Sequence, residues 1–336
     1  MELNEKQLNN LIEEFGIEVV NPERGYWLVR AGKEGAFFEE FLTRGFTGIG
    51  YGLNDVDSIK ELSKEELKEK VEQAYPDEKQ PGHIAGKIYN FFHEIKKGDV
   101  IVMPSAGRKV VAFGIVKEEN IYFDDSLIME QSIEAIDSED YDIPNKRRKI
   151  SWRKPISSKY LQPKLILNLF SPHGLSGITD PEIIKLIDVN MNDIFIKEDT
   201  GYLTFQINRE KNIDLKALTN LMDALEGISS KLSKENMLSV QMNLNSPGKI
   251  TVYGTVKVIL ASLAIIALFG GKAIIKAVGN IEIETGTEGL VSPLLKDYYA
   301  HAENMEEIKI KYIEAIDKLN IDEAEKIKMI REKIEN

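Results

Sequence analysis

Two short acidic patterns come nearest to a hydrolytic metal site in this chain. Many restriction nucleases hold magnesium with a carboxylate followed along a strand by the pattern Glu-x-Lys, because carboxylate oxygens suit this hard cation. Residues 282–284 (EIE) follow a glycine turn but carry a carboxylate where the lysine belongs. Residues 307–309 (EIK) have the right letters, yet they lie in a lysine-rich stretch with helical periodicity. We interpret both patterns as chance matches, and they are the basis for a cryptic nuclease as an alternative function.

A serine–histidine–serine arrangement occurs in the loop SPHGLSG, residues 171–177. Ser171, His173 and Ser176 are close in sequence, but nucleophilic catalysis needs a serine held against a base that a third group orients. The sequence specifies no such group, so a turn is the simpler interpretation. Phosphate-binding and HExxH patterns are absent, and the chain has no cysteine and four histidines that are far apart. The sequence therefore predicts no catalytic residue, no metal site and no cofactor.

The chemistry that remains is recognition of nucleic acid by a basic segment around an aromatic ring. Trp152 is flanked by six basic residues, namely Lys146, Arg147, Arg148, Lys149, Arg153 and Lys154. Their sign is opposite to that of the whole chain, whose net charge is −12. A protein that coats nucleic acid is usually basic, so any contact here must come from a local patch of this kind. A solvated surface is the alternative interpretation of the run.

The elements that would position these residues divide the chain into two parts. The chain has 336 residues, 43% hydrophobic and 29% charged, which suits a folded α+β protein with two domains. We expect a sensor domain over residues 1–160, a connector with a short helix over 161–190, and an α+β domain over 191–336. The acidic beginning is neither a signal nor a transit peptide, and the lack of cysteine fits a reducing compartment, so we expect a cytoplasmic protein.

Within the first part, glycine-rich and apolar stretches predict alternating strands and helices. Residues 45–52 (GFTGIGYG) are too rich in glycine for a helix and predict a strand that other backbone approaches closely. Ser63 and Glu66 form a capping box that opens a charged helix. A further helix is expected over residues 82–94, with short apolar strands at 100–103 and 110–116.

The second part is expected to contain two hairpins and a long amphipathic helix. One hairpin turns at residues 199–201 and the other at 245–248, where glycine, asparagine, aspartate or proline mark the turn. Asp214 is expected to cap a helix whose leucines recur on one face.

An uncharged run of 14 residues, VILASLAIIALFGG at 258–271, follows the second hairpin. A transmembrane helix needs about 20 apolar residues. Extension of the run to Val278 takes in Lys272 and Lys276, and a central lysine costs about 2.5–3.5 kcal/mol on insertion. We therefore expect a buried or oligomer-interface helix, and a membrane-disrupting effector that uses residues 256–278 is the alternative.

Three segments of the first part carry a family resemblance in their order and spacing. They are residues 25–32 (GYWLVRAG) with 45–52, residues 85–105 (AGKIYNFFHEIKKGDVIVMPS) with 110–116 (VVAFGIV), and residues 147–152 (RRKISW). Together they resemble the EVE-like branch of the PUA-like superfamily, found at the amino ends of some prokaryotic restriction and defence proteins. The resemblance covers residues 25–155. It implies a small β-barrel with flanking helices that binds nucleic acid, in several members through an aromatic cage around a flipped, modified base.

The resemblance also implies roles for aromatic and basic residues. The stacking residues would be Trp27, Tyr51 and Trp152, because aromatic rings bind the π-face that every base presents. The phosphate contacts would be Arg30, Arg147, Arg148 and Arg153. Each aromatic residue is equally compatible with a place in the core. Restriction relatives carry a nuclease or a nucleotide-driven motor after the reader, and neither pattern is found in this chain.

These observations favour a nucleic-acid or nucleotide sensor of prokaryotic antiviral defence without a catalytic site of its own. In this interpretation the first domain recognises a modified base, and the second forms a homo-oligomer and transmits the event. Membrane association is expected under the effector alternative, in which the same sensor controls insertion of residues 256–278.

Overall fold

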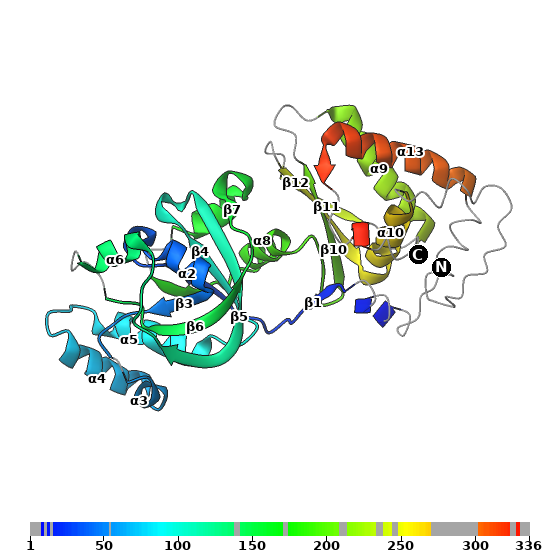
Figure 1. The fold of residues 1–336 in the computed structure, drawn as a ribbon. Coiled ribbons are helices and arrows are strands. Elements are labelled where there is room, and N and C mark those ends of the chain that lie inside the picture. Colours follow the sequence, from blue (N-terminus) through cyan, green and yellow to red (C-terminus); the bar gives the residue numbers. More distant parts are fainter. Residues whose placement is uncertain are drawn as a thin grey trace. The chain divides into compact units, whose positions relative to one another are not determined.

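The computed structural model divides the chain into two compact units (Figure 1). We call Glu23–Met191 the N unit, and Met1–Pro22 together with Asn192–Asn336 the C unit. These limits differ from the expected ones, because the beginning of the chain belongs to the C unit and the expected connector belongs to the N unit. The structure describes residues 8–9, 12–13, 16–53, 55–137, 142–170, 174–207, 214–232, 238–243, 248–269, 302–322 and 327–329.

The N unit is built on a mixed sheet with the strand order β3-β6-β5-β4-β2-β8, and β7 pairs with β5 beside this path. β2 and β4 are parallel, and the other neighbours are antiparallel. An irregularity between Val116 and Ile121 interrupts the pairing of β5 with β6, and such bulges bend a strand. The strands are β2 (Tyr26–Val29), β3 (Phe46–Ile49), β4 (Val100–Pro104), β5 (Val110–Phe123), β6 (Lys146–Trp152), β7 (Ile156–Ser157) and β8 (Leu175–Gly177).

The expected mixture of helices and strands is confirmed, but a closed barrel is not. Within the described residues, the end strands β3 and β8 do not pair with each other, so the sheet path stays open. A barrel would need hydrogen bonds between the first and last strands of the path.

Helices cover both faces of this sheet. On one face, Val29 and Ile101 pack with residues of α5 (Pro81–Tyr89). On the other face, Leu28 and Val102 pack with residues of α7 (Pro163–Asn168) and α8 (Pro181–Met191). Successive residues of a strand point to opposite faces, so each strand contributes to two cores.

The segment from 161 to 191 is therefore structural and not a connector. Strand β8 pairs with β2, and Ile183, Leu186 and Ile187 of α8 are buried with Tyr26. The sequence pattern missed this because β8 is three residues long and follows a loop.

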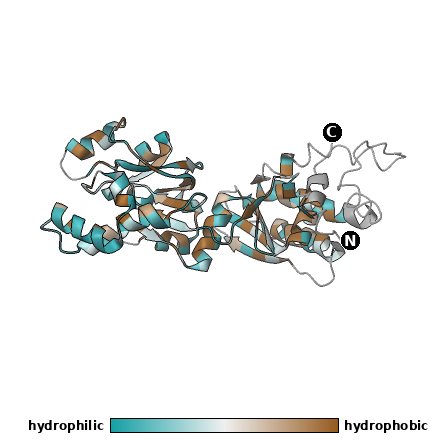
Figure 2. Ribbon diagram, turned by 90° about the horizontal axis from the view of Figure 1, so that it is seen from below, coloured by the Kyte–Doolittle hydropathy of each residue, from teal (hydrophilic) through white to brown (hydrophobic). Residues whose placement is uncertain are grey.

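Two helix predictions hold in detail. Helix α4 (Lys64–Ala74) begins at Ser63 with the expected capping box to Glu66, and most of its length is hydrophilic (Figure 2). Helix α5 continues into a π-helical turn, Asn90–Glu94, so the helix expected over residues 82–94 contains a wider last turn. The remaining helices of the N unit are α2 (Phe38–Arg44), α3 (Val56–Lys60) and α6 (Glu130–Asp137).

The C unit has a second sheet in the order β1-β9-β10-β12-β11, with β13 paired to β10. Strand β1 runs parallel to β9, although the two are separated in sequence by the whole N unit. Both expected hairpins are confirmed, as β9 with β10 and β11 with β12. The strands are β1 (Glu18–Val20), β9 (Ile194–Lys197), β10 (Thr200–Ile207), β11 (Ser239–Asn243), β12 (Gly248–Thr255) and β13 (Ile321–Asp322).

Three helices pack with this second sheet, and α9 (Leu215–Leu232) and α13 (Ala302–Leu319) lie side by side (Figure 1). The main-chain N–H of Ala217 donates to the carboxylate of Asp214 at 2.9 Å, which confirms the predicted cap. The apolar run forms α10 (Val256–Phe269), and its residues 258–263 are all buried. A helix that is apolar on every side needs such cover.

Within the described residues, no helix has the length and the hydropathy that crossing a bilayer requires. Helix α10 spans 14 residues and is part of the C-unit core, which agrees with the expectation of a buried helix. The extension of the apolar run from residue 270 to 278 lies outside the described residues.

Candidate functional site

A hollow of about 520 Å³ opens in the N unit where five segments meet. Its lining comes from the loop after β2, the end of β3, helix α5, the segment before β6 and the segment before β8. Small-molecule pockets are commonly about 300–1,000 Å³, so the hollow has room for a nucleobase. Of the predicted site residues, Arg30 and Tyr51 line it, whereas Trp27, Trp152, Arg147, Arg148 and Arg153 do not.

Tyr51 lies at the pocket in a strained backbone conformation. Its φ is 65°, a left-handed value that residues with a side chain rarely adopt. Its N–H donates to the carboxylate of Asp142 at 3.1 Å, and its carbonyl accepts from the ammonium group of Lys146 at 3.3 Å. These two contacts fix the residue on either side of its Cα. Strain of this kind persists where the surroundings impose it, and it concentrates at functional sites.

Glycine allows the Tyr51 segment to lie so close to its partner. A Cβ at Gly50 would come within 2.5 Å of the Cβ of Asp142, and one at Gly48 within 3.0 Å of the carbonyl of Pro144. The close backbone approach predicted for residues 45–52 is therefore confirmed, and it brings Asp142 to the pocket.

Asp142 joins the pocket to helix α4 as well. The phenol of Tyr75 donates to the Asp142 carboxylate at 2.7 Å, on the same oxygen that accepts from the Tyr51 N–H. Burial, followed by this hydrogen bond and the nearby negative charge, raises the pKa of Tyr75 well above its usual value. Burial and the charge of Asp142 also raise the pKa of Tyr51, so both phenols stay neutral in the physiological range.

Lys146 lies beneath this arrangement and is buried. Its ammonium group donates to the carbonyl oxygens of Tyr51 and Leu53 and to the side-chain oxygen of Asn145, the last two at 2.9 and 2.8 Å. Burial lowers the pKa of Lys146 to about 8, with partial opposition from Asp142. Lys146 therefore supports the pocket from inside the fold and does not offer its charge to solvent.

Three cationic residues line the pocket, namely Arg30, Lys33 and Lys87. The ammonium nitrogen of Lys87, on α5, is 5.9 Å from the centre of the Tyr51 ring, within the range of a cation–π contact. The Nη2 of Arg30 donates to the carbonyl of Leu169 at 3.0 Å. Burial, and then the positive charge of Arg108, lower the pKa of Arg30. The Tyr51 ring thus shares one cavity with three cationic residues.

Trp27 contributes to the core of the N unit. Its indole N–H donates to the carboxylate of Asp99 at 2.9 Å, and that carboxylate also accepts from the N–H groups of Gly25 and Lys96. A Cβ at Gly25 would come within 2.8 Å of the indole nitrogen, so the ring fits against a bare backbone. Three donors around one buried carboxylate indicate a structural role for this part of the chain.

Trp152 is also a packing residue. Its indole N–H donates to the carbonyl oxygens of Phe41 and Phe46, at 2.9 and 3.2 Å, and so ties β6 to α2 and β3. Its ring lies over Gly114, where a Cβ would be 2.5 Å from the indole carbon Cε3. The predicted aromatic cage of three rings is therefore not assembled, and Tyr51 is the one of the three that reaches the pocket.

The predicted phosphate contacts Arg147 and Arg148 are buried, so this part of the prediction is wrong. Arg147 has no exposed surface and Arg148 has 1%. The guanidinium of Arg147 donates to Asp124, to the carbonyl of Ser126 and to the carbonyl of Pro144, at 2.7, 2.7 and 2.9 Å, and lies 4.2 Å above the Phe46 ring.

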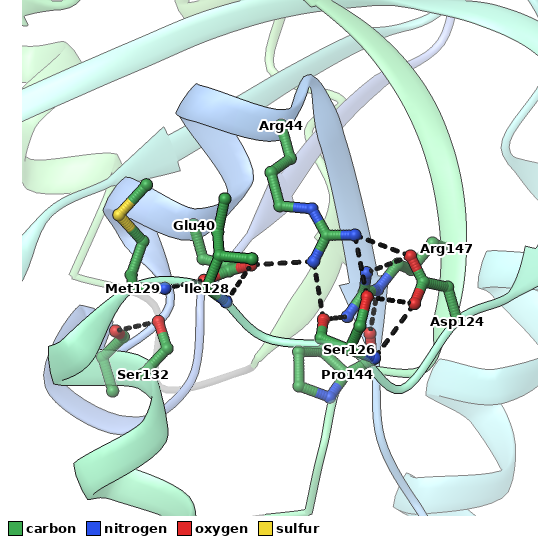
Figure 3. A network of polar contacts seen from close by, with 10 residues as sticks. Glu40, Arg44, Asp124, Ser126, Ile128, Met129, Ser132, Pro144 and Arg147 are labelled. Atoms are coloured by element: carbon green, nitrogen blue, oxygen red, sulfur yellow. Dashed lines mark hydrogen bonds and ion pairs between the residues drawn. The ribbon is translucent and has the colours of Figure 1, made fainter.

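Arg147 belongs to a network that fastens the segment before α6 (Figure 3). Arg44 donates to Asp124 at 2.7 Å from the other side and to Glu40 at 2.9 Å. The fully buried Glu40 accepts the main-chain N–H groups of Ile128 and Met129. The guanidinium of Arg147 therefore already donates to three acceptors of the protein, and it could bind a phosphate only by giving up these hydrogen bonds.

Arg148 has a different structural task on the opposite side of β6. Its guanidinium donates to the carbonyl oxygens of Phe91 and Phe92 in the π-helical turn, at 2.9 and 3.2 Å, and to that of Glu119 at 3.0 Å. Helix ends leave carbonyl groups without partners, and this arginine satisfies two of them. Burial lowers the pKa of Arg148 to about 10. Arg153 is exposed, as a phosphate contact would be, but it does not line the pocket.

Only some residues of the patterns considered for catalysis lie within the described part of the chain. Glu307 and Lys309 lie on helix α13, where Glu307 pairs with Lys311 at 3.2 Å. Ser176 lies in β8, whereas Ser171, His173 and residues 282–284 are outside the described residues. Across the described ranges, no three histidine, aspartate or glutamate side chains are grouped as metal ligands.

Sequence reasoning missed Lys87, Asp142 and the buried role of Lys146. Each lies in a segment remote from Tyr51, and no local pattern marks it as a neighbour. The glycines around Tyr51 were the available signal, because they predicted that another backbone segment lies against them.

Part of the N unit is similar to a known protein family. A family model described as a domain of unknown function (DUF8426) matches residues 27–164, fewer than half of the chain. The match contains Tyr51, Lys87, Asp142 and Lys146. No curated protein and no solved structure matches the chain.

Proposed function

We propose that the N unit recognises a base, and specifically a modified base of a nucleic acid or nucleotide, in the pocket around Tyr51. The single observation that carries this proposal is the convergence of the Tyr51 ring, Arg30 and Lys87 on one hollow of about 520 Å³. Stacking on an aromatic ring contributes about 1–3 kcal/mol per base, and a cavity wall adds selectivity for the substituents of that base.

The strained Tyr51 backbone supports the same function. Asp142 and Lys146 hold Tyr51 before any ligand arrives, so little conformational entropy is lost on binding. The ring has two χ angles, and its backbone is already fixed. Its left-handed φ of 65° is the kind of backbone strain that clusters at binding and active sites.

A PUA-like fold for the N unit is part of this proposal. The resemblance of residues 25–155 to the EVE-like branch supports a PUA-like origin for the N unit, with the sheet left open between β3 and β8. Under this proposal the protein acts in prokaryotic antiviral defence, in the cytoplasm, as a sensor without a catalytic site. The C unit would form the homo-oligomer, and Val240 and Met242 on its edge strand β11 are 37% and 46% exposed, which leaves apolar surface for self-association.

The test measures binding of the full chain to matched DNA and RNA oligonucleotides with and without base modifications. Fluorescence anisotropy reports the affinity at each concentration of a salt series. We expect the protein to bind one modified oligonucleotide more tightly than its unmodified counterpart, with an affinity that depends only weakly on salt. Contacts to the base and not to phosphates would account for the difference in affinity between the two oligonucleotides. Tyr51→Asn removes the ring while asparagine tolerates the left-handed backbone, and we expect affinity to fall about tenfold or more.

Tyr160→Asn is the matched control, because Tyr160 is a partly exposed tyrosine that does not line the pocket. Equal affinities for Tyr51→Asn and Tyr160→Asn would contradict the proposal. So would binding that disappears with salt and ignores the modification.

A further inference from the structure

Lys87 brings to the pocket a positive charge that has no acceptor in the protein. Its side chain, on helix α5, is partly buried, and its ammonium nitrogen lies 5.9 Å from the centre of the Tyr51 ring. Across the described part of the chain, this ammonium group has no hydrogen bond and no ion pair. An ammonium group that has lost part of its water without gaining an acceptor is unfavourable, so this side of the pocket favours a ligand that supplies one.

The wall of the pocket beside Lys87 contains backbone without side chains. Gly32, Gly48, Gly50 and Gly174 all contribute to the lining. A Cβ at Gly174 would lie 4.0 Å from the Lys87 nitrogen, so the absence of a side chain there leaves the ammonium group open on this side. The charge is therefore accessible from the cavity.

The two carboxylates of the lining leave Lys87 unpaired. Asp142 accepts from the phenol of Tyr75 and from the N–H of Tyr51, both on the same oxygen. Glu34 is exposed to solvent. Among the described residues, neither carboxylate forms an ion pair with Lys87, so a group of the ligand can take that place.

A base stacked on the Tyr51 ring would lie next to this charge. Stacked aromatic rings have their centres about 4.5–7 Å apart, and the Lys87 nitrogen is 5.9 Å from the centre of the Tyr51 ring. A substituent at the edge of such a base can thus come within hydrogen-bond distance of the ammonium group. An anionic oxygen would form a charge-assisted hydrogen bond there, whereas a methyl group would leave the ammonium group without an acceptor.

We propose that Lys87 selects the substituent of the base that stacks on Tyr51, and that this substituent carries an anionic oxygen, as a carboxyl group does. This inference rests on the proposed base recognition at Tyr51 and names the chemical class of the modification. Because a pyrimidine or a purine can carry a carboxyl group, both kinds of base serve as probes.

The experiment measures, by fluorescence anisotropy, the affinity of the full chain for DNA and RNA oligonucleotides that differ at one base. One pair carries 5-methylcytosine or 5-carboxylcytosine, a second pair carries N6-methyladenine or N6-carboxymethyladenine, and the unmodified sequences complete the set. Lys87→Met removes the charge and keeps a long, unbranched side chain, whereas Lys87→Arg keeps the charge. Lys79→Met is the matched control, because Lys79 is an exposed lysine of the N unit that does not line the pocket. Thermal unfolding of each variant checks that the fold is kept.

In at least one pair, we expect the carboxyl-bearing oligonucleotide to bind at least about tenfold more tightly than its methyl-bearing counterpart. Lys87→Met should remove this difference without weakening the binding of the methyl-bearing oligonucleotide, and Lys79→Met should keep it. Lys87→Arg should retain part of the difference, because the guanidinium group keeps the charge but has a different shape.

Methyl-bearing oligonucleotides that bind as tightly as the carboxyl-bearing ones in both pairs would overturn the selection of an anionic substituent. A loss of affinity in Tyr51→Asn with the same probes would show that base recognition still holds. A preference for the carboxyl group that persists in Lys87→Met would assign it to another cation and overturn the role of Lys87. Affinities that are equal for modified and unmodified oligonucleotides, and unchanged in Tyr51→Asn, would overturn both the selection and the base recognition.

Discussion

The ammonium group of Lys146 donates a hydrogen bond of 3.3 Å to the main-chain carbonyl of Tyr51, from a position with no exposed surface. Tyr51 needs this support because its φ of 65° is unfavourable for a tyrosine. The buried ammonium group of Lys146 thus holds the backbone of Tyr51, whose ring lines the pocket. Because burial lowers the pKa of Lys146, the stability of the folded protein should depend on pH.

Stability should rise with pH between about 8 and 9.5 because of Lys146. Its folded pKa is about 8, below the usual 10.5, so in this interval the unfolded chain binds more protons at this residue than the folded chain does. The free energy of unfolding then increases with pH, by at most about 1.4 kcal/mol per pH unit. Urea denaturation at several pH values measures the slope.

Lys146→Met is the comparison variant, since it should lack this rise in stability. The comparison stops at pH 9.5 because Tyr51 and Tyr75 have raised pKa values. A group with a raised folded pKa loses its contribution as pH increases, so the two phenols act with the opposite sign above pH 10. An identical slope in the wild type and in Lys146→Met would refute the role given to Lys146.

Asp142→Asn should shift the titration of Tyr75. Burial is the largest cause of the raised Tyr75 pKa and remains in the variant, but the hydrogen bond to a carboxylate and its negative charge are lost. The pKa of Tyr75 should therefore fall part of the way toward 10, measured by the absorbance of tyrosinate at alkaline pH. Asp137→Asn, at an exposed position at the end of α6, should leave the titration unchanged.

Arg147→Lys should destabilise the protein by about 2–4 kcal/mol, because lysine cannot replace three hydrogen bonds and the stacking on Phe46. Arg153→Lys should change stability by less than about 0.5 kcal/mol, because Arg153 is exposed. Midpoints of urea denaturation give both values. A small effect at Arg147 would contradict the buried network and restore this arginine as a candidate surface contact.

Trp152→Phe should lower stability without changing affinity for a nucleotide or oligonucleotide. The variant keeps most of the ring but leaves the carbonyl oxygens of Phe41 and Phe46 without the indole donor, which costs about 1–3 kcal/mol. Thermal unfolding and anisotropy together make the measurement. Loss of affinity in a variant that still folds would return Trp152 to the binding site, where the family resemblance placed it.

Local patterns in the sequence predicted local structure well. The capping box at Ser63, the cap at Asp214 and the strand pairing of the two hairpins each depend on residues close in sequence, and each is confirmed. The glycines at 45–52 also predicted a close neighbour correctly. These features depend on backbone geometry that a few residues determine by themselves.

The location of charge could not be predicted in the same way. A basic run is usually solvated, but β6 lies between β3 and β5, where carbonyl oxygens of Phe91, Phe92 and Pro144 need donors. Those acceptors come from segments remote in sequence. For the same reason the pocket partners of Tyr51 were not predicted, since Lys87 and Asp142 reach it only through the tertiary fold.

The parallel pairing of β1 with β9 determines when the sheet of the C unit can form during synthesis of the chain. Glu18 pairs with Phe195, so β1 leaves the ribosome before the entire N unit and its partner strand afterwards. At about 5–20 residues per second, β1 waits roughly ten to thirty seconds for β9. All of the N unit is translated in this interval, and the C unit can complete its sheet only after the N unit has been made.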